Sequence, residues 1–348
     1  MANSLHDFTA ANTNWRHALR ANNHRTWIII GIFLLIYLGI GLLIDMYLYT
    51  SSYPQASLAQ IFRAIVTFQL FPIATSVTCI IAVISLLVTY SLYDKLMLLG
   101  TDYHEITPQT AQSPQEQQLY NVVEEMKIAA GLKYIPRVFI IDADYMNAFA
   151  SGYSEKSAMV AITRGLIQKL NRDELQAVMA HELSHIRHLD IKLTLTASLL
   201  ANLTIMVLDV FFYNIIFSRR RDERSGNALA TIIILLRYLL PIINICLLLY
   251  LSRTREYMAD AGCIELMRNN QPLASALLKI QQDHIAHQDN YKAAYLNTPH
   301  ENVRREAYIF DPTQAGIKGI GSLNDMFSTH PSTEDRLAAI GFILKNKV

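Results

Sequence analysis

Two histidines four residues apart, with a glutamate beside the first, are the residues of this chain best placed to do chemistry. His181, Glu182 and His185 form one copy of the pattern H-E-x-x-H. On a helix, side chains four residues apart project from the same face, so both imidazoles can bind one Zn²⁺ ion. Glu182 lies next to that face, where its carboxylate can take a proton from water that the metal activates. The stretch therefore predicts a zinc-dependent hydrolase.

A catalytic zinc takes three protein ligands and keeps one position open for water. The continuation H-E-x-x-H-x-x-G-x-x-H would supply a third histidine, but positions 188 and 191 are His188 and Ile191. We therefore expect a carboxylate from a later helix. Glu256 and Asp260 are four residues apart, so one can bind the metal while the other orients a ligand histidine. The simpler alternative is a surface salt bridge between Glu256 and a neighbouring arginine, with the two histidines as polar surface.

The residues before the first histidine predict the helix that the motif needs. Asn171 is a good N-cap, and Glu174 follows three residues later, as in a capping box. Leu175, Val178 and Met179 then supply apolar positions at helical spacing. We therefore expect the H-E-x-x-H residues on a helix that starts directly after residue 171.

The surrounding polar region predicts an α+β core. A capping box at Ser113, with proline at the next position, opens a helix that ends at Gly131. Residues 137–142 and 157–163 are expected as strands, and residues 165–169 as a short helix. Helices, strands and the H-E-x-x-H helix together indicate a metalloprotease core of the gluzincin kind.

Four long apolar stretches predict membrane helices, which need about 20 apolar residues each. Of the 348 residues, 52% are hydrophobic. The four stretches are residues 27–44, 64–93, 193–218 and 228–251. The first follows a long polar leader and lacks a small-residue cleavage site, so we interpret it as an uncleaved anchor. Asp209 and Arg237 interrupt the last two stretches, where a contact within the protein suits them because charges facing lipid are costly.

The basic residues predict the orientation. Arg16, Arg20 and Arg25 precede the first stretch, whereas residues 46–62 contain no lysine or arginine. The positive-inside rule then places the N-terminus and the catalytic residues in the cytoplasm. The basic residues 219–224 would lie outside if both later stretches cross fully, so the sequence leaves that crossing open.

Charge and cysteine content exclude two further classes. The formal net charge of +1 gives no basis for a nucleic-acid partner. The three cysteines, Cys79, Cys246 and Cys263, have no paired spacing, so neither a disulfide framework nor a cysteine zinc site is expected.

Several stretches taken together identify a family resemblance. They are, in order, residues 147–152, 163–166, 173–185, 255–260 and 329–336. This set resembles the HtpX-type membrane zinc metalloproteases, which share a catalytic core with the CAAX prenyl proteases. The resemblance covers roughly residues 115–345. Two departures are Ser332, where the family usually has a second proline, and a longer polar insert at residues 282–306.

The resemblance implies a role for each candidate site residue. His181, His185 and Glu256 would bind one Zn²⁺ per chain, Glu182 would be the general base, and Asp260 would orient a ligand histidine.

The same resemblance extends to the substrate. Asn147 would contact the substrate backbone, and His330 would stabilise the oxyanion. Arg336 would hold the His330 segment in place, and residues 157–163 would form the edge strand on which a substrate peptide pairs.

The resemblance also implies the biology. We expect an integral endopeptidase of a bacterial-type inner membrane that cleaves misfolded or damaged membrane proteins from the cytoplasmic side, as part of a stress response. Polypeptides and the lipid bilayer would be its partners, together with other membrane quality-control proteases. The alternatives are a prenyl-protein protease and a catalytically silent zinc-containing scaffold.

We divide the chain into five parts on these grounds. They are a cytoplasmic arm, two membrane helices with an external loop, the first part of the protease domain, a hydrophobic hairpin and the second part of the protease domain, at residues 1–26, 27–93, 94–192, 193–251 and 252–348.

Overall fold

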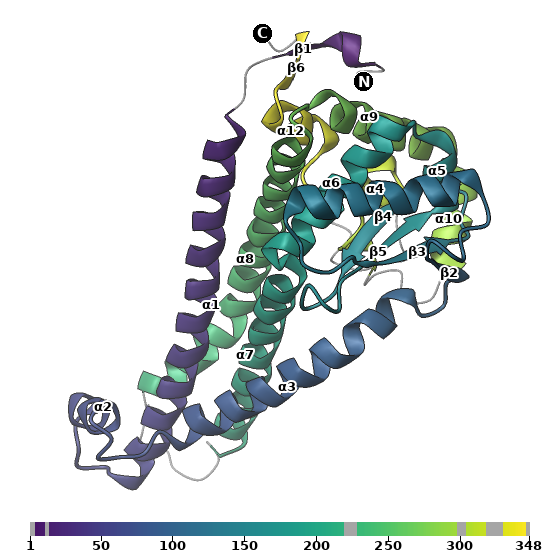
Figure 1. The fold of residues 1–348 in the computed structure, drawn as a ribbon. Coiled ribbons are helices and arrows are strands. Elements are labelled where there is room, and N and C mark those ends of the chain that lie inside the picture. The colour runs from purple at the N-terminus through teal and green to yellow at the C-terminus, as the bar shows by residue number, and fades with distance from the viewer. Residues whose placement is uncertain (1–3, 11–13, 219–227, 298–303, 318–329, 346–348) are drawn as a thin grey trace. The chain divides into compact units, whose positions relative to one another are not determined.

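The computed structural model describes residues 4–10, 14–218, 228–297, 304–317 and 330–345 (Figure 1). The chain folds into two compact units. The sheet unit comprises Met1–Thr26, Tyr90–Lys192 and Leu249–Val348, and the helical unit comprises Trp27–Thr89 and Leu193–Leu248. The basic residues 219–224 and part of the polar insert, residues 298–303, lie outside the described residues.

The central feature of the sheet unit is a four-stranded mixed sheet. Its order is β2 (Tyr103–Ile106), β3 (Arg137–Ile141), β5 (Met159–Thr163) and β4 (Ala148–Ser151). Strands β3 and β5 are parallel, and the other two pairs are antiparallel. The prediction that residues 157–163 form the edge strand is wrong, because β5 lies between β3 and β4. The edge strands are β2 and β4, and β4, the neighbour of β5, has only four residues, too few to show a periodic pattern in the sequence.

Both faces of this sheet are covered. Helices α4 (Pro114–Ala130), α6 (Arg172–His188) and α9 (Gln271–Ala286) pack with alternate strand residues such as Ile140 and Ile162. On the other face, residues such as Phe139 and Ala161 pack with tyrosines, two of them from α10 (Gln288–Asn297). Burial on both faces explains why β3 and β5 are nearly continuous hydrophobic runs.

Helix α6 begins and ends in ways that place the functional residues. Asn171 Oδ1 accepts a hydrogen bond from the Glu174 N–H at 2.9 Å, and Glu174 Oε2 accepts one from the Asn171 N–H at 3.0 Å. The predicted capping box is thus confirmed. Leu189 ends the helix in the left-handed conformation, with φ of 54°, and α7 (Asp190–Ser218) begins at the next residue.

Shorter elements complete the sheet unit. Strands β1 (Phe8–Ala10) and β6 (Phe342–Leu344) pair with each other in an antiparallel sheet that the sequence did not predict. The remaining elements are η1 (Leu5–Asp7), α5 (Arg164–Lys169), η2 (Pro312–Ala315) and α12 (Thr333–Ala339).

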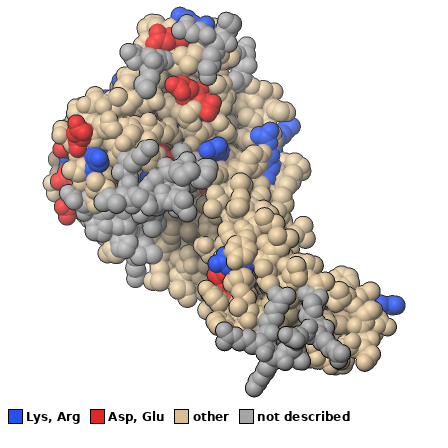
Figure 2. All heavy atoms as spheres, turned by 180° about the vertical axis from the view of Figure 1, so that it is seen from behind, with Lys and Arg blue, Asp and Glu red and all other residues tan. Residues whose placement is uncertain are grey.

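Long apolar helices make up the helical unit. Within the described residues, four helices are long and apolar enough to cross a membrane, namely α1 (Trp15–Ser52), α3 (Ile73–Leu98), α7 and α8 (Ala228–Met267). A fifth, α2 (Leu58–Val66), connects the first two. The predicted fold class, an α+β protease core with about four membrane helices, is confirmed. On the face shown in Figure 2, large areas of the described surface carry no charged side chain.

Three charged residues of the helical unit, Asp45, Asp209 and Arg237, have partners within that unit. Arg237 of α8 forms an ion pair with Asp209 of α7, as the cost of charge in lipid suggested. Asp45 of α1 accepts hydrogen bonds from the backbone N–H groups of Ala74 and Thr75 at 2.7 and 3.0 Å. It therefore caps the first turn of α3.

Candidate metal centre

Three side chains from two helices bring their donor atoms together in the sheet unit. His181 and His185 lie one turn apart on α6, and Glu256 comes from α8. The two Nε2 atoms are 3.1 Å apart. The Glu256 carboxylate oxygens lie 3.7 Å from His181 Nε2 and 3.5 Å from His185 Nε2. Among the described residues these three form a group that could hold a metal ion.

The hydrogen bonds of the two imidazoles test whether a metal fits. Nδ1 of His181 lies 3.0 Å from an Asp260 oxygen, and Nδ1 of His185 lies 2.7 Å from an Asp190 oxygen. A carboxylate accepts a hydrogen bond from the N–H at each Nδ1, so each Nε2 carries a lone pair. These lone pairs converge and repel each other unless a cation lies between them. Ligands about 2.1 Å from a tetrahedral ion are about 3.4 Å apart, so the observed spacing fits a metal.

The state of His185 suits metal binding. Burial, and next the adjacent His181, lower the pKa of His185 to about 3. The imidazole is therefore neutral at physiological pH, which a ligand must be. Its side chain is 13% exposed, compared with 0% for His181 and 8% for Glu256. The donor group is therefore most accessible on the His185 side.

Glu182 is completely buried beside the donors. Neither of its carboxylate oxygens has a partner within hydrogen-bond geometry among the described residues. Burial, and next the nearby Glu256 carboxylate, raise the pKa of Glu182 well above its ordinary value. A buried carboxylate with a raised pKa beside the donor atoms is suited to accept a proton.

Arg336 joins the last helix of the protein to the donor group. Its guanidinium makes two hydrogen bonds to Asp260, at 2.9 and 2.6 Å, and a third, at 2.6 Å, to the carbonyl of Ile309. Although burial opposes its charge, the Asp260 carboxylate raises the pKa of Arg336. Arg336 therefore holds Asp260 in the position from which Asp260 orients His181.

His330 is brought to the same group from a distant part of the chain. Its Nδ1 lies 3.4 Å from a Glu256 oxygen, and the residue is 2% exposed. Although burial opposes its charge, the Glu256 carboxylate raises the pKa of His330. The ring can therefore present an N–H donor beside the metal ligands.

Asp190 and Arg255 belong to the site and were missed in the sequence. Asp190 holds His185 and also forms an ion pair with Arg255. Arg255, considered only as a surface partner for Glu256, is 3% exposed and donates to the carbonyl of His188 at 3.2 Å. The turn at Leu189 folds Asp190 back onto His185, and no sequence pattern predicts a leucine in that conformation.

Asn147 lies at the start of the edge strand, with its amide facing protein groups. Nδ2 donates to the carbonyl of Phe310 at 3.0 Å and to the hydroxyl of Tyr295 at 3.2 Å, and Oδ1 accepts from the Phe310 N–H at 3.3 Å. The Tyr295 hydroxyl in turn lies 3.0 Å from Nε2 of His284. Helix α10 of the polar insert thus supports the segment where the substrate is expected, and the substrate role of Asn147 stays a prediction.

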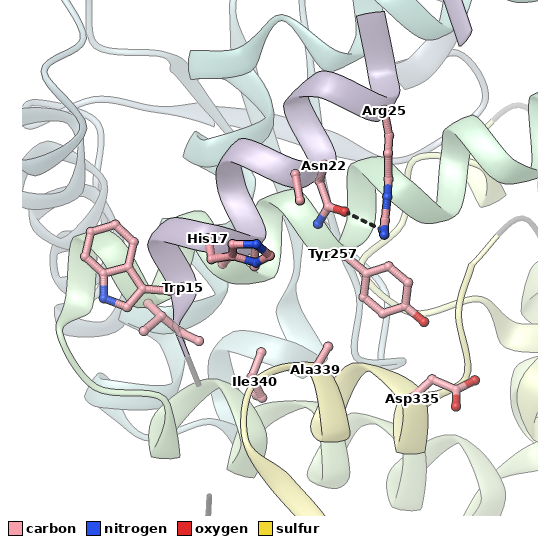
Figure 3. A pocket seen from close by; sticks show the side chains of 12 residues that line it. Trp15, His17, Asn22, Arg25, Tyr257, Asp335, Ala339 and Ile340 are labelled. Carbon is pink, nitrogen blue, oxygen red and sulfur yellow. Dashed lines mark hydrogen bonds between the residues drawn. The ribbon is translucent and has the colours of Figure 1, made fainter. Parts of the chain in front are cut away.

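A separate pocket lies beside the part of α8 that follows Glu256 (Figure 3). Tyr257 and Ile264 line it from α8, and Asn22 and Arg25 from α1, with Arg25 donating to Asn22 at 3.3 Å. Its volume is about 340 Å³. Glu256 and the two histidines do not line it, so this pocket is not the metal centre.

Two histidines on one helix and a glutamate from a later helix form the donor set of a metallopeptidase. The long apolar helices of the same chain indicate that this metallopeptidase is a membrane protein. Residues 113–342 match peptidase family M48, and the chain belongs to this metallopeptidase family. The resemblance to the HtpX-type proteases is thereby confirmed.

Two relatives show how far the similarity extends. The chain is 35% identical to a protease HtpX homolog of Helicobacter pylori (strain Shi470) over 328 residues, which are 94% of this chain and 98% of that protein. It is 40% identical to a protease HtpX homolog of Limosilactobacillus fermentum over 230 residues, which are 63% of this chain and 71% of that protein. Among solved structures, S. mikatae Ste24p aligns with 90% of this chain and 66% of its own, at 18% identity and a TM-score of 0.48.

Proposed function

We propose that this M48 membrane protease is a zinc endopeptidase that cleaves misfolded or damaged membrane proteins at the cytoplasmic face of a bacterial inner membrane. The observation that carries the proposal is the convergence of His181, His185 and Glu256 next to the buried carboxylate of Glu182. Two imidazoles and one carboxylate are a common catalytic zinc set, which leaves a fourth position for water or substrate.

The protein residues divide the catalytic work. A zinc ion held by the three donors would act as a Lewis acid that polarises the scissile carbonyl and lowers the pKa of the attacking water. Glu182 takes the proton from that water and delivers it to the leaving amine. His330 donates a hydrogen bond to the oxyanion that develops on the carbonyl oxygen. Asp260 and Asp190 keep the two ligand histidines in the required orientation and tautomer.

The edge strand β4 offers a way to bind varied polypeptides. The Asn147 carbonyl accepts from the Thr163 N–H at 2.9 Å, so the alternate residues Ala148 and Ala150 direct their backbone groups away from β5. Ala148 is covered, because its carbonyl accepts from the Ile309 N–H at 2.9 Å. The backbone of Ala150 is close to Glu182 and favours its ionised form. Phe149 also forms an isolated antiparallel bridge with Tyr308 on this side of β4, so an extended substrate would pair beside the catalytic base by displacing or continuing that segment.

The compartment and the substrates follow from sequence features and family. Arg16, Arg20 and Arg25 before the first apolar stretch favour a cytoplasmic N-terminus, and two crossings return the chain to the same side. The division at residues 1–26, 27–93, 94–192, 193–251 and 252–348 is part of this proposal. A protease that recognises backbone on an open strand edge suits unfolded or damaged substrates, and cooperation with other quality-control proteases fits the same role.

A cleavage assay on the purified full-length protein tests the function. Casein should be cleaved, a chelator should stop the cleavage, and added zinc should restore it. Glu182→Gln is the matched control for a contaminating protease, because it should lose turnover by about 10²–10⁴ while it keeps its metal. Full activity in this variant, or activity that survives chelation, would refute the proposal. Exclusive cleavage of a farnesylated CAAX peptide would instead establish the prenyl-protein protease.

A further inference from the structure

The connection between α1 and α3 folds into a helix of its own. Figure 1 shows α2 nearly end-on beside the lower end of α1. Ser57 caps it: the Ser57 hydroxyl accepts from the Gln60 N–H at 3.3 Å, and Gln60 Oε1 accepts from the Ser57 N–H at 2.8 Å. This capping box fixes the start of the helix, and all of its residues belong to the helical unit.

The apolar face of helix α2 extends well beyond the part that the protein covers. Ile61 and Ile65 are buried, at 1% and 2% exposure. At 100° per residue, Leu58, Phe62 and Val66 continue that face around the helix, yet they are 39%, 47% and 54% exposed. The opposite side carries the polar residues Gln60, Arg63 and Thr67.

The exposed apolar surface continues from α2 to the beginning of α3. Phe68, Phe71 and Ile73 are 73%, 59% and 55% exposed. The Tyr49 hydroxyl at the end of α1 donates to the carbonyl of Phe71 at 2.6 Å, which ties this segment to α1. The ring of Tyr49 also lies beside that of Tyr53, with 6.2 Å between the two ring centroids. Tyrosines at helix ends are typical of the interface between membrane and water.

We propose that α2 lies flat in the membrane–water interface where α1 ends and α3 begins, with Leu58, Phe62 and Val66 inserted among the lipid acyl chains. Lipid is the occupant that the structure favours over a protein partner, because α1 and α3 are both long and apolar enough to span the bilayer. The chain that joins two such helices starts and ends at the membrane surface. A short amphipathic helix there buries its apolar side in lipid and keeps Gln60 and Arg63 in water.

Spin labels on the full-length protein in vesicles test this placement. Cys79 and Cys246 are replaced by alanine, and Cys263 is kept because it is fully buried. A single cysteine is then introduced as Phe62→Cys or, as the matched control from the opposite face, Gln60→Cys. Both proteins are reconstituted in phosphatidylethanolamine–phosphatidylglycerol vesicles. Collisions of the label with oxygen, which partitions into lipid, and with a water-soluble nickel chelate are measured by electron paramagnetic resonance.

The label should meet mainly oxygen at residue 62 and mainly the nickel chelate at residue 60. At residue 62 the ratio of oxygen to nickel accessibility should be several-fold higher than at residue 60. Equal and high nickel accessibility at both positions would place α2 in water and overturn the proposal. A label at residue 62 that neither reagent reaches would show a protein partner on this face, which also overturns the assignment to lipid. A repeat with Val66→Cys guards against a local disturbance at residue 62 and should match the lipid result.

Discussion

Asp190 has two separable tasks, and removing it should reveal both. It holds Nδ1 of the ligand His185 at 2.7 Å, and it neutralises Arg255, with which it is buried at 4% and 3% exposure. Removing the carboxylate partner of a ligand histidine typically lowers metal affinity by about 10–100-fold. Leaving a buried charge without its partner costs about 3–5 kcal/mol. Asp190→Ala should therefore lose both metal affinity and stability.

A second substitution separates the two effects. Arg255→Met removes the stranded charge, so the double variant Asp190→Ala/Arg255→Met should recover most of the lost stability. Its metal affinity should stay low, because His185 still lacks its partner. Zinc affinity is measured by competition with a chelating dye, and stability by thermal unfolding in detergent. Both use the Glu182→Gln background, which prevents self-cleavage.

The exposed pair Arg187–Glu265 provides the control on the same two helices. Its atoms are 3.0 Å apart, and the side chains are 37% and 25% exposed. Glu265→Ala should cost at most about 1 kcal/mol and leave zinc binding unchanged. If the double variant regained wild-type zinc affinity, Asp190 would act on the metal only through Arg255. If Asp190→Ala kept both properties, the reasoning from its contacts would be wrong.

Three further predictions concern the metal, pH and topology. Glu256→Ala should lose its zinc, because two histidines alone hold the ion weakly, and stoichiometric metal in that variant would remove Glu256 from the ligand set. Burial lowers the pKa of His284 from 6.5 to about 4 in the folded protein. As the pH falls, His284 is therefore protonated in the unfolded chain before it is protonated in the folded one. Stability should thus be complete above pH 6.5 and decrease by about 3 kcal/mol toward pH 4, and thermal unfolding of His284→Gln should lack this part of the decrease. Tags at both ends of the chain should be reachable only from the cytoplasm and a tag near Tyr53 only from outside; an external C-terminus would reverse the proposed orientation.

Local sequence rules predicted the parts of the fold that depend on neighbouring residues. The capping box at Asn171, the helix that carries His181 and His185, and the left-handed Gly131 after α4 all follow from such rules. The four apolar helices follow from length and composition in the same way. These features need no knowledge of which segments meet in space.

Features that depend on distant partners could not be predicted in this way. Strand β4 pairs with β5, so β5 is not the edge strand that the sequence predicted. Both strands are apolar, and no local pattern encodes their order in the sheet. The roles of Asp190 and Arg255 depend on one turn at Leu189 and on a helix more than sixty residues later. Arg336 was expected to hold the His330 segment. Its pairing with Asp260 became evident only once α12 was placed in the structure.

The donor set is divided by the membrane segments of the chain itself. His181 and His185 precede α7, and Glu256 lies beyond the apolar part of α8. During synthesis the ribosome therefore completes the two histidines first, then the hydrophobic pair, and only afterwards the glutamate. We expect a chain whose hydrophobic pair fails to enter the bilayer to leave Glu256 apart from the histidines. Under the proposed function, metal loading would then depend on correct insertion, and a misinserted copy would stay inert.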